Sequence, residues 1–420
     1  MDLDLIYLDW FEGCVLTLVA FLGWLVAGYA RTYLRGEPCQ AAFWKWFAVT
    51  LLGVSSFVVS GQWLQLGLSW MLTSLGVHRL LLLHPGRREA LVAAHKKFLI
   101  SRSADLCFAA AAFVWWRAGG GPTLNGTVAL PQAQLVAWLL TLAVILKSAL
   151  YPFHGWLVQV AEAPTPVSAL LHAGVLNLGA VLLYKANPLL GAAPEAQLGL
   201  AGWGCLSAFY GSLASLRQSD IKGSLAASTV AQMGFVLMEC ACGAFHLALV
   251  HILAHSLYKA RGFLRSGSIV EQLAQERLWQ PRFRPHLSVW LVASLLLTPW
   301  AGFSAPALGW IWCHTRVWWL GPVLAGISFS CGQVRLADWT AASPLWAVLG
   351  LWALLQLTVH TTLVYQPGGV LSDRLDRLFL WLDSADEWLT RLALRVWPVE
   401  LPVRTRFFRL AKARSEVAHS

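Results

Sequence analysis

Charged residues are scarce in this sequence: Asp, Glu, Lys and Arg together make up 12% of its 420 residues. A soluble domain carries about 25%. Hydrophobic residues reach 57%, and the mean hydropathy is +0.59. Apolar runs of about 20 residues, the length that crosses a bilayer, recur along most of the chain. This composition argues against a soluble globular protein and predicts an all-α, polytopic membrane helix bundle in a lipid bilayer.

Paired cysteines, nucleotide-binding motifs and a convincing set of haem ligands are missing as well. The eight cysteines are scattered without a CxxC pair, which argues against a disulfide framework or a zinc site. The net charge of +10 comes without an aromatic-basic RNA-binding module, so nucleic acid is not expected as a partner. We therefore expect no metal or cofactor in this chain, and these absences argue against an enzyme.

The apolar runs predict about twelve membrane spans, two of them broken. If the spans alternate in direction, the basic loops fall on one side and the acidic N-terminus on the other. The positive-inside rule then places the N-terminus outside, and we expect the bacterial inner membrane as the location. The predicted spans are Gly13–Ala30, Phe43–Ser60, Gln62–Leu83, Phe98–Trp116, Gln134–Val160 (broken), Thr165–Tyr184, Leu198–Leu216, Gly223–Cys240, Phe245–Phe263, Leu287–Cys313 (broken), Val317–Ser330 and Leu345–Val364.

The two broken spans share a Pro-aromatic-x-Gly-aromatic signature, "PFHGW" and "PWAGF". Paired interruptions in two halves of a chain are typical of transporters built from inverted repeats, with the ion path at the breaks. Pro152 and Pro299 are therefore the predicted helix breaks. The predicted organisation is N-terminal transmembrane helices (1–97), a first repeat (98–240), a second, degenerate repeat (241–369) and an amphipathic, basic tail (370–420).

Ionisable residues inside predicted spans are candidates for an ion path, because each is costly in a bilayer. Lys147 lies in the fifth span, five residues before Pro152, whose missing N–H leaves a carbonyl free for water. His172 lies in the next span. An inert lysine that reaches to the interface, and a structural histidine, are the alternatives.

The ninth span reads "FHLALVHILAHSLYKARG" and places His251, His255 and Lys259 at successive i, i+4 steps, on one helix face. Histidine exchanges protons near neutral pH, so this row predicts a proton relay. A metal site and simple packing are the alternatives.

Two further charged groups lie near span ends. Arg102 and Asp105 stand at i, i+3 in the fourth span and are expected to pair, as a structural clamp or as a gate. Asp220 is placed to favour a helix N-terminus. Lys222, two residues later, is a candidate for the proton path or simply a positive-inside residue.

Three blocks of this sequence closely resemble the antiporter-like membrane subunits, which include the large proton-pumping subunits of respiratory complex I and the Mrp sodium/proton antiporters. The blocks are "KSALYPFHGWLVQVAEAPTPVSALLHAG", "QSDIKGSLAASTVAQMGFVLM" and "HLALVHILAHSLYKARGFLRSGSI". "SRSAD" in the fourth span is most similar to the L type. The resemblance implies a proton path through water-linked lysines and histidines on broken helices. The positions that match the family's proton path are Lys147, His172, Lys222, His251, His255 and Lys259. The fourth-span pair Arg102 and Asp105 also matches the family.

Two charged positions of that family are replaced here. A glutamate normally follows a tryptophan in the third span, where this chain has Met71. A lysine normally follows "GFxS" in the second broken helix, where Ala305 stands. The family's first helices and its long lateral helix are also expected to be missing, which puts a complete complex I pump in doubt.

A shortened, divergent subunit of this kind resembles the membrane partner of DAB-type dissolved inorganic carbon pumps. The resemblance implies that cation flow drives CO2 hydration to bicarbonate in a large peripheral zinc subunit similar to β-carbonic anhydrases. The ionisable groups of the predicted path are lysines and histidines, which favours protons over sodium ions. Alternatives are a subunit of complex I, a membrane hydrogenase or an Mrp antiporter, and a membrane anchor that moves no ions.

Overall fold

The computed structural model describes residues 6–84, 88–124, 126, 128–160, 163–218 and 220–266, with three separate positions at 388, 390 and 392. Pro299, Ala305, the three spans predicted after Phe263 and most of the C-terminal tail lie outside these residues. The described chain forms the helices α1 (Trp10–Tyr33), α2 (Gln40–Val59), α3 (Trp63–Leu81), α4 (Arg88–Arg117), α5 (Leu130–Lys147), α6 (Gly155–Gln159), α7 (Thr165–Ala173), the 3₁₀ turn η2 (Val175–Asn177), α8 (Leu178–Lys185), α9 (Asn187–Gly191), α10 (Pro194–Arg217), α11 (Ile221–Ala241) and α12 (Phe245–Arg265).

The prediction of a helical membrane protein is confirmed for this part of the chain. Every span predicted before residue 264 overlaps a helix or a helix pair, and no strand forms among the described residues. Among the described residues, six helical stretches are long and apolar enough to cross a membrane: Trp10–Tyr33, Gln40–Val59, Ala90–Arg117, Leu130–Lys147, Thr165–Lys185 and Ile221–Ala241. The helices α3, α10 and α12, also predicted as spans, are not among these six.

Helix starts follow the side-chain chemistry of the sequence. The Asp9 carboxylate accepts hydrogen bonds from the backbone N–H groups of Phe11 and Glu12, at 2.8 and 3.1 Å. The Glu12 carboxylate accepts from the N–H of Asp9 at 3.2 Å, which completes a capping box at α1. Asp220 caps α11 by accepting from the N–H of Gly223 at 2.7 Å, so its predicted place at a helix N-terminus is confirmed.

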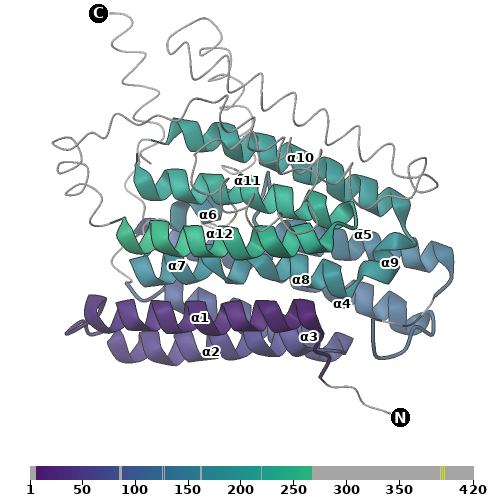
Figure 1. Cartoon of the computed structure of the whole chain (residues 1–420), viewed down its shortest axis with the longest axis horizontal. Helices are drawn as coiled ribbons and strands as arrows, with labels where there is room; N and C mark the ends of the chain where they lie inside the picture. Colours follow the sequence, from purple (N-terminus) through teal and green to yellow (C-terminus); the bar gives the residue numbers. More distant parts are fainter. Residues whose placement is uncertain are drawn as a thin grey trace, which may run out of the picture.

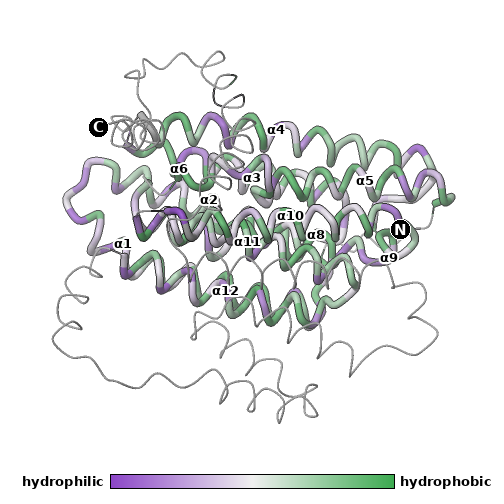
Figure 2. The backbone as a smooth tube through the Cα atoms, turned by 90° about the horizontal axis from the view of Figure 1, so that it is seen from above, coloured by the Kyte–Doolittle hydropathy of each residue, from purple (hydrophilic) through white to green (hydrophobic). Residues whose placement is uncertain are grey.

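The helices lie side by side in a bundle, with α1 and α2 at one side and α10 at the other (Figure 1). Between them, α7 contacts α1, α3 and α12 and is almost entirely buried. Hydrophobic residues dominate along most of the helices (Figure 2). Large apolar side chains on the outside fit a lipid-facing surface; they include Leu52, Leu64, Leu68, Met71, Leu106, Phe113 and Trp116.

Glycines allow α10 and α11 to touch backbone to backbone. A Cβ atom added to Gly204 would lie 2.6 Å from the carbonyl oxygen of Gly234, and one added to Gly211 would lie 2.4 Å from the backbone nitrogen of Ala231. Small residues at such a crossing are the usual way in which membrane helices approach closely. This contact holds α11, which carries several groups of the candidate site described below, against the rest of the bundle.

Alanine at two positions of α10 should have opposite effects on stability. Gly204→Ala places a methyl group against rigid backbone and should destabilise the protein by about 1–3 kcal/mol. Gly202→Ala has open space around its Cβ position and should be neutral or stabilising by up to about 1 kcal/mol, since alanine is the better helix former. Thermal unfolding of both variants in detergent measures the difference. Equal melting temperatures would contradict the close packing at Gly204.

Candidate functional site

Lys147 is the last residue of α5, at a helix end that the structure places earlier than predicted. The break was expected at Pro152, but the helix already stops at Lys147. The N–H of Leu150 donates to the carbonyl of Ile145 at 3.2 Å, and Ala149 adopts a left-handed φ of 54° between them. This is the bonding pattern of a helix C-terminus. Pro152 lies in the non-helical stretch that follows, before α6.

An ion pair holds Lys147 in this position. Its ammonium lies 2.6 Å from Oδ1 of Asp105, and the side chains of Lys147 and Asp105 are only 10% and 11% exposed. The other oxygen of Asp105 lies 2.6 Å from the guanidinium of Arg102, which confirms the predicted fourth-span pair. Trp70 covers the ammonium, with its ring centre 4.7 Å away. A helix C-terminus also favours a cation, so the chain offers Lys147 several sources of stabilisation for its charge.

Lys97 is a second buried lysine beside this pair, and sequence reasoning misplaced it. The predicted fourth span began at Phe98, which left Lys96 and Lys97 in a basic loop. The helix α4 instead starts at Arg88, and both lysines are buried. Lys97 donates to the carbonyl and hydroxyl oxygens of Ser74 on α3, at 2.6 and 2.8 Å, and lies within electrostatic range of Lys147.

The span that carries His172 is interrupted directly after it. A single helix over Thr165–Tyr184 was predicted, but α7 ends at Ala173 and the 3₁₀ turn η2 precedes α8. The side chain of Asn177 donates to the carbonyl of Ala173 at 3.0 Å and to the Ser256 hydroxyl at 2.9 Å. Asn177 therefore satisfies a backbone carbonyl at the end of α7 and joins the interruption to α12.

His172 is fully buried, and its neighbours determine which ring nitrogen carries a proton. Its Nδ1 atom lies 3.2 Å from the Thr229 hydroxyl. That hydroxyl donates its own proton to the Leu225 carbonyl at 2.9 Å, so Nδ1 of His172 is the donor to Thr229. Nε2 has no hydrogen-bond partner among the described residues. It is the nitrogen that can accept a proton.

The three residues predicted to share one face of α12 do share it. His251, His255 and Lys259 are all buried on the side that packs against the bundle. Nε2 of His255 donates to the carbonyl of His172 at 3.3 Å. Lys259 donates to the carbonyl of Leu225 and to the Ser228 hydroxyl, both at 2.6 Å. The histidines of α7 and α12 thus come together.

Glu239 on α11 completes the row at its far end, a role that sequence reasoning missed. Its carboxylate oxygens lie 2.9 and 3.1 Å from Nδ1 of His251, whose Nε2 lies 2.6 Å from the side-chain oxygen of Gln232. Both ring nitrogens of His251 therefore lie against side-chain oxygen atoms of α11. Lys222 lies half-buried in the first turn of α11.

A second buried ion pair joins the start of the chain to α8. Lys185 donates to Glu12 at 2.9 Å, and the two side chains are 4% and 0% exposed. The Tyr184 hydroxyl donates to the Asp9 carboxylate beside them. Neither Glu12 nor Lys185 lies inside a predicted span. The search for ionisable residues within spans therefore did not identify them.

Comparison with known proteins shows the family of this chain. The transmembrane family described as NADH:quinone oxidoreductase/Mrp antiporter matches residues 60–330. The chain belongs to this family. A member described as a probable inorganic carbon transporter subunit, DabB2 of Halothiobacillus neapolitanus, is 36% identical over 91% of this chain and 78% of its own. Another so described, DabB of Hydrogenovibrio crunogenus, is 33% identical over 96% of this chain and 85% of its own.

The solved structures agree on the fold. A chain of the Mrp complex from Dietzia sp. DQ12-45-1b superposes with a TM-score of 0.61 at 22% identity. The match covers 99% of this chain and 52% of the Mrp chain, so this protein spans about half of that one. At this identity the likeness concerns the fold.

In this member of the NADH:quinone oxidoreductase/Mrp antiporter family, the position expected to hold the third-span glutamate faces outward. Met71 is 43% exposed on the surface of α3, while its neighbour Trp70 points inward onto Lys147. The carboxylate beside Lys147 comes instead from Asp105 on α4.

Thr229→Val should impair transport through its effect on His172. Valine keeps the shape of threonine but removes the acceptor for Nδ1, which frees the ring to change tautomer. We expect a loss of activity of about tenfold, the value of one lost hydrogen bond of about 1.4 kcal/mol. Thr141→Val is the matched control, because the buried Thr141 hydroxyl has no partner among the described residues. Equal transport rates in the two variants would contradict a role for Thr229.

Proposed function

We propose that this chain is the proton-conducting membrane subunit of an energy-coupled inorganic carbon uptake complex. The observation that carries the proposal is the buried Lys147–Asp105 ion pair at the end of α5. A cation in a spanning helix is costly unless it is paired, and such residues mark ion pathways. A lysine next to a carboxylate at an interrupted helix can receive and release a proton when water reaches the gap.

The proposed path has two parts within the described residues. Lys147 and Asp105 form the first, where α5 stops and α6 resumes after a non-helical stretch. His172, His255 and Lys259 lead along α7 and α12 in the second, and His251 with Glu239 ends it. Lysine and histidine exchange protons, whereas sodium ions prefer oxygen ligands, so protons are the proposed coupling ion. Lys222 is the proposed entry on the loop side.

The proposal also covers the number of spans, the membrane and the partner subunit. The chain has about twelve spans in two inverted repeats, with a second broken helix at Pro299, and lies in the bacterial inner membrane with its N-terminus outside. Its partner is a large peripheral subunit, similar to carbonic anhydrases, that holds zinc and carries out CO2 hydration. The similarity to inorganic carbon transporter subunits over nine-tenths of the chain supports this assignment.

Co-expression with its partner in a host that lacks carbonic anhydrase tests the proposal. The pair should restore growth at ambient CO2, and a protonophore should abolish uptake of labelled inorganic carbon, whereas a sodium ionophore should not. Co-purification with a flavin and iron–sulfur assembly would instead assign the chain to a complex I-like enzyme or membrane hydrogenase, and sodium/proton exchange in vesicles to an Mrp antiporter. Uptake that neither ionophore changes would indicate that the chain is a membrane anchor that conducts no ions.

A further inference from the structure

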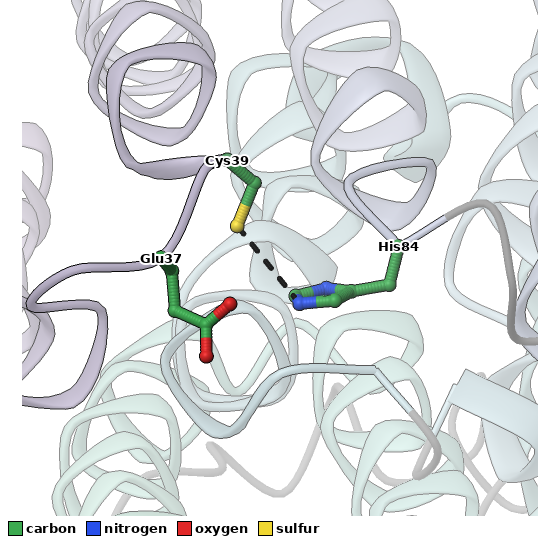
Figure 3. A group of neighbouring side chains, drawn as sticks. All are labelled: Glu37, Cys39 and His84. Carbon is green, nitrogen blue, oxygen red and sulfur yellow. Dashed lines mark hydrogen bonds between the residues drawn. The ribbon is translucent and has the colours of Figure 1, made fainter.

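Three metal-ligand side chains meet outside the helices, at some distance in sequence from the groups discussed above. Glu37 and Cys39 belong to the loop between α1 and α2, and His84 follows the end of α3 (Figure 3). One ligand atom from each lies within 4.8 Å of those of the other two. The Cys39 sulfur and Nε2 of His84 are 3.9 Å apart.

The hairpin of α2 and α3 brings these groups together. Its turn, at Ser60–Gln62, lies at the opposite end from the α1–α2 loop, so the end of α3 returns to that loop. Cys39 and His84 are half-buried and Glu37 is exposed. Nδ1 of His84 has no partner among the described residues, so the thiol of Cys39 is the polar group that the ring faces.

We propose that Glu37, Cys39 and His84 bind one Zn²⁺ ion. A thiolate, an imidazole and a carboxylate are the three ligand types that zinc takes, and the sulfur ligand disfavours Mg²⁺ and Ca²⁺. Two ligands of a tetrahedral zinc ion lie about 3.5 Å apart, given bond lengths of about 2.3 Å to sulfur and 2.0 Å to nitrogen. The Cys39–His84 pair is within a few tenths of an ångström of that spacing, and the exposed Glu37 side chain is free to adjust.

The charge of the three ligands and the solvent exposure of the site also suit Zn²⁺. A thiolate and a carboxylate together neutralise Zn²⁺, so the bound site carries no net charge. Three protein ligands leave one coordination position, which water fills on the exposed side of Glu37. The ion would fasten the α1–α2 loop to the end of α3. This proposal departs from the sequence expectation that the chain holds no metal, and it does not depend on the proposed transport function.

Cobalt is the probe for the first test. The full-length chain, purified alone in detergent and stripped with a chelator, should bind one equivalent of Co²⁺ and show the near-ultraviolet thiolate-to-cobalt charge-transfer band. Cys39→Ser should abolish the band, and His84→Ala and Glu37→Gln should weaken binding at least about tenfold. Cys14→Ser, which changes a half-buried cysteine on α1, should bind as the wild type does. A band that survives in Cys39→Ser would overturn the proposal.

A second measurement needs no variant and so does not depend on how a variant folds. Mass spectrometry of tryptic peptides follows the alkylation of Cys39 in the wild-type chain, with and without added Zn²⁺. We expect zinc to slow alkylation of Cys39 at least about tenfold and to leave Cys14 unchanged, because a coordinated thiolate is shielded. Equal rates with and without zinc would show that Cys39 and His84 share only a hydrogen bond, and the proposal would fail.

Discussion

Lys147→Ala should abolish coupled inorganic carbon uptake while leaving the complex assembled. The variant removes the ammonium at the end of α5 but leaves Asp105 paired with Arg102, so no buried carboxylate is left alone. A missing proton-transfer group costs about 100-fold or more, which brings uptake to the background of cells without the gene. Lys45→Ala is the control: it removes a lysine from the exposed side of α2. Uptake in Lys147→Ala at the level of Lys45→Ala would reject conduction through Lys147.

Variants of Asp105 distinguish the effect of the Lys147–Asp105 ion pair on stability from its effect on transport. Asp105→Asn leaves the largely buried Lys147 and the partly exposed Arg102 as neighbouring cations, which should destabilise the protein by up to about 3 kcal/mol and reduce the amount of assembled complex. Adding Lys147→Met should restore much of that stability, because it removes one of the two cations. Uptake should stay at background in the double variant. Thermal unfolding and immunoblots measure the first effect, and isotopic uptake the second.

Glu239→Gln should have the second large effect. The carboxylate of Glu239 contacts His251, and the amide that replaces it cannot accept a proton from the ring. We expect uptake to fall about 100-fold with assembly unchanged. Glu239→Asp, which keeps the charge, should retain part of the activity. Glu195→Gln removes a carboxylate on the exposed first turn of α10 and should have no effect.

A purely structural role for Glu239 predicts a different result. In that case Glu239→Gln and Glu239→Asp would lower the melting temperature and the uptake in proportion. Full uptake in Glu239→Gln would remove the His251–Glu239 pair from the proposed path and leave His172, His255 and Lys259 as its described end.

Sequence reasoning identified most of the charged groups and few of their partners. Lys147, Arg102 and Asp105 were each recognised inside a predicted span, but the 2.6 Å contact between Lys147 and Asp105 joins positions 42 residues apart. Spacing rules relate only residues on one helix. Glu239 lies within the predicted span Gly223–Cys240, and the rule applied to Lys147 would have found it there.

Helix ends were predicted less well, because they depend on backbone geometry. Ala149 is a strong helix former by type, yet it adopts the left-handed conformation that ends α5. At the interruption after His172, Asn177 contacts Ser256 on α12, which follows 79 residues later. The missed burial of Lys97 has a similar origin: α4 begins ten residues before the predicted span.

The Glu12–Lys185 pair imposes an order on the assembly of the protein. The two residues are separated by 173 positions, and a ribosome that adds about 5–20 residues per second needs about 10–35 s to make that stretch. The helix α1 therefore enters the membrane before the partner of its Glu12 has been made. Its final docking through Glu12 can occur only after α8 has emerged, so α1 reaches its place long after its own synthesis.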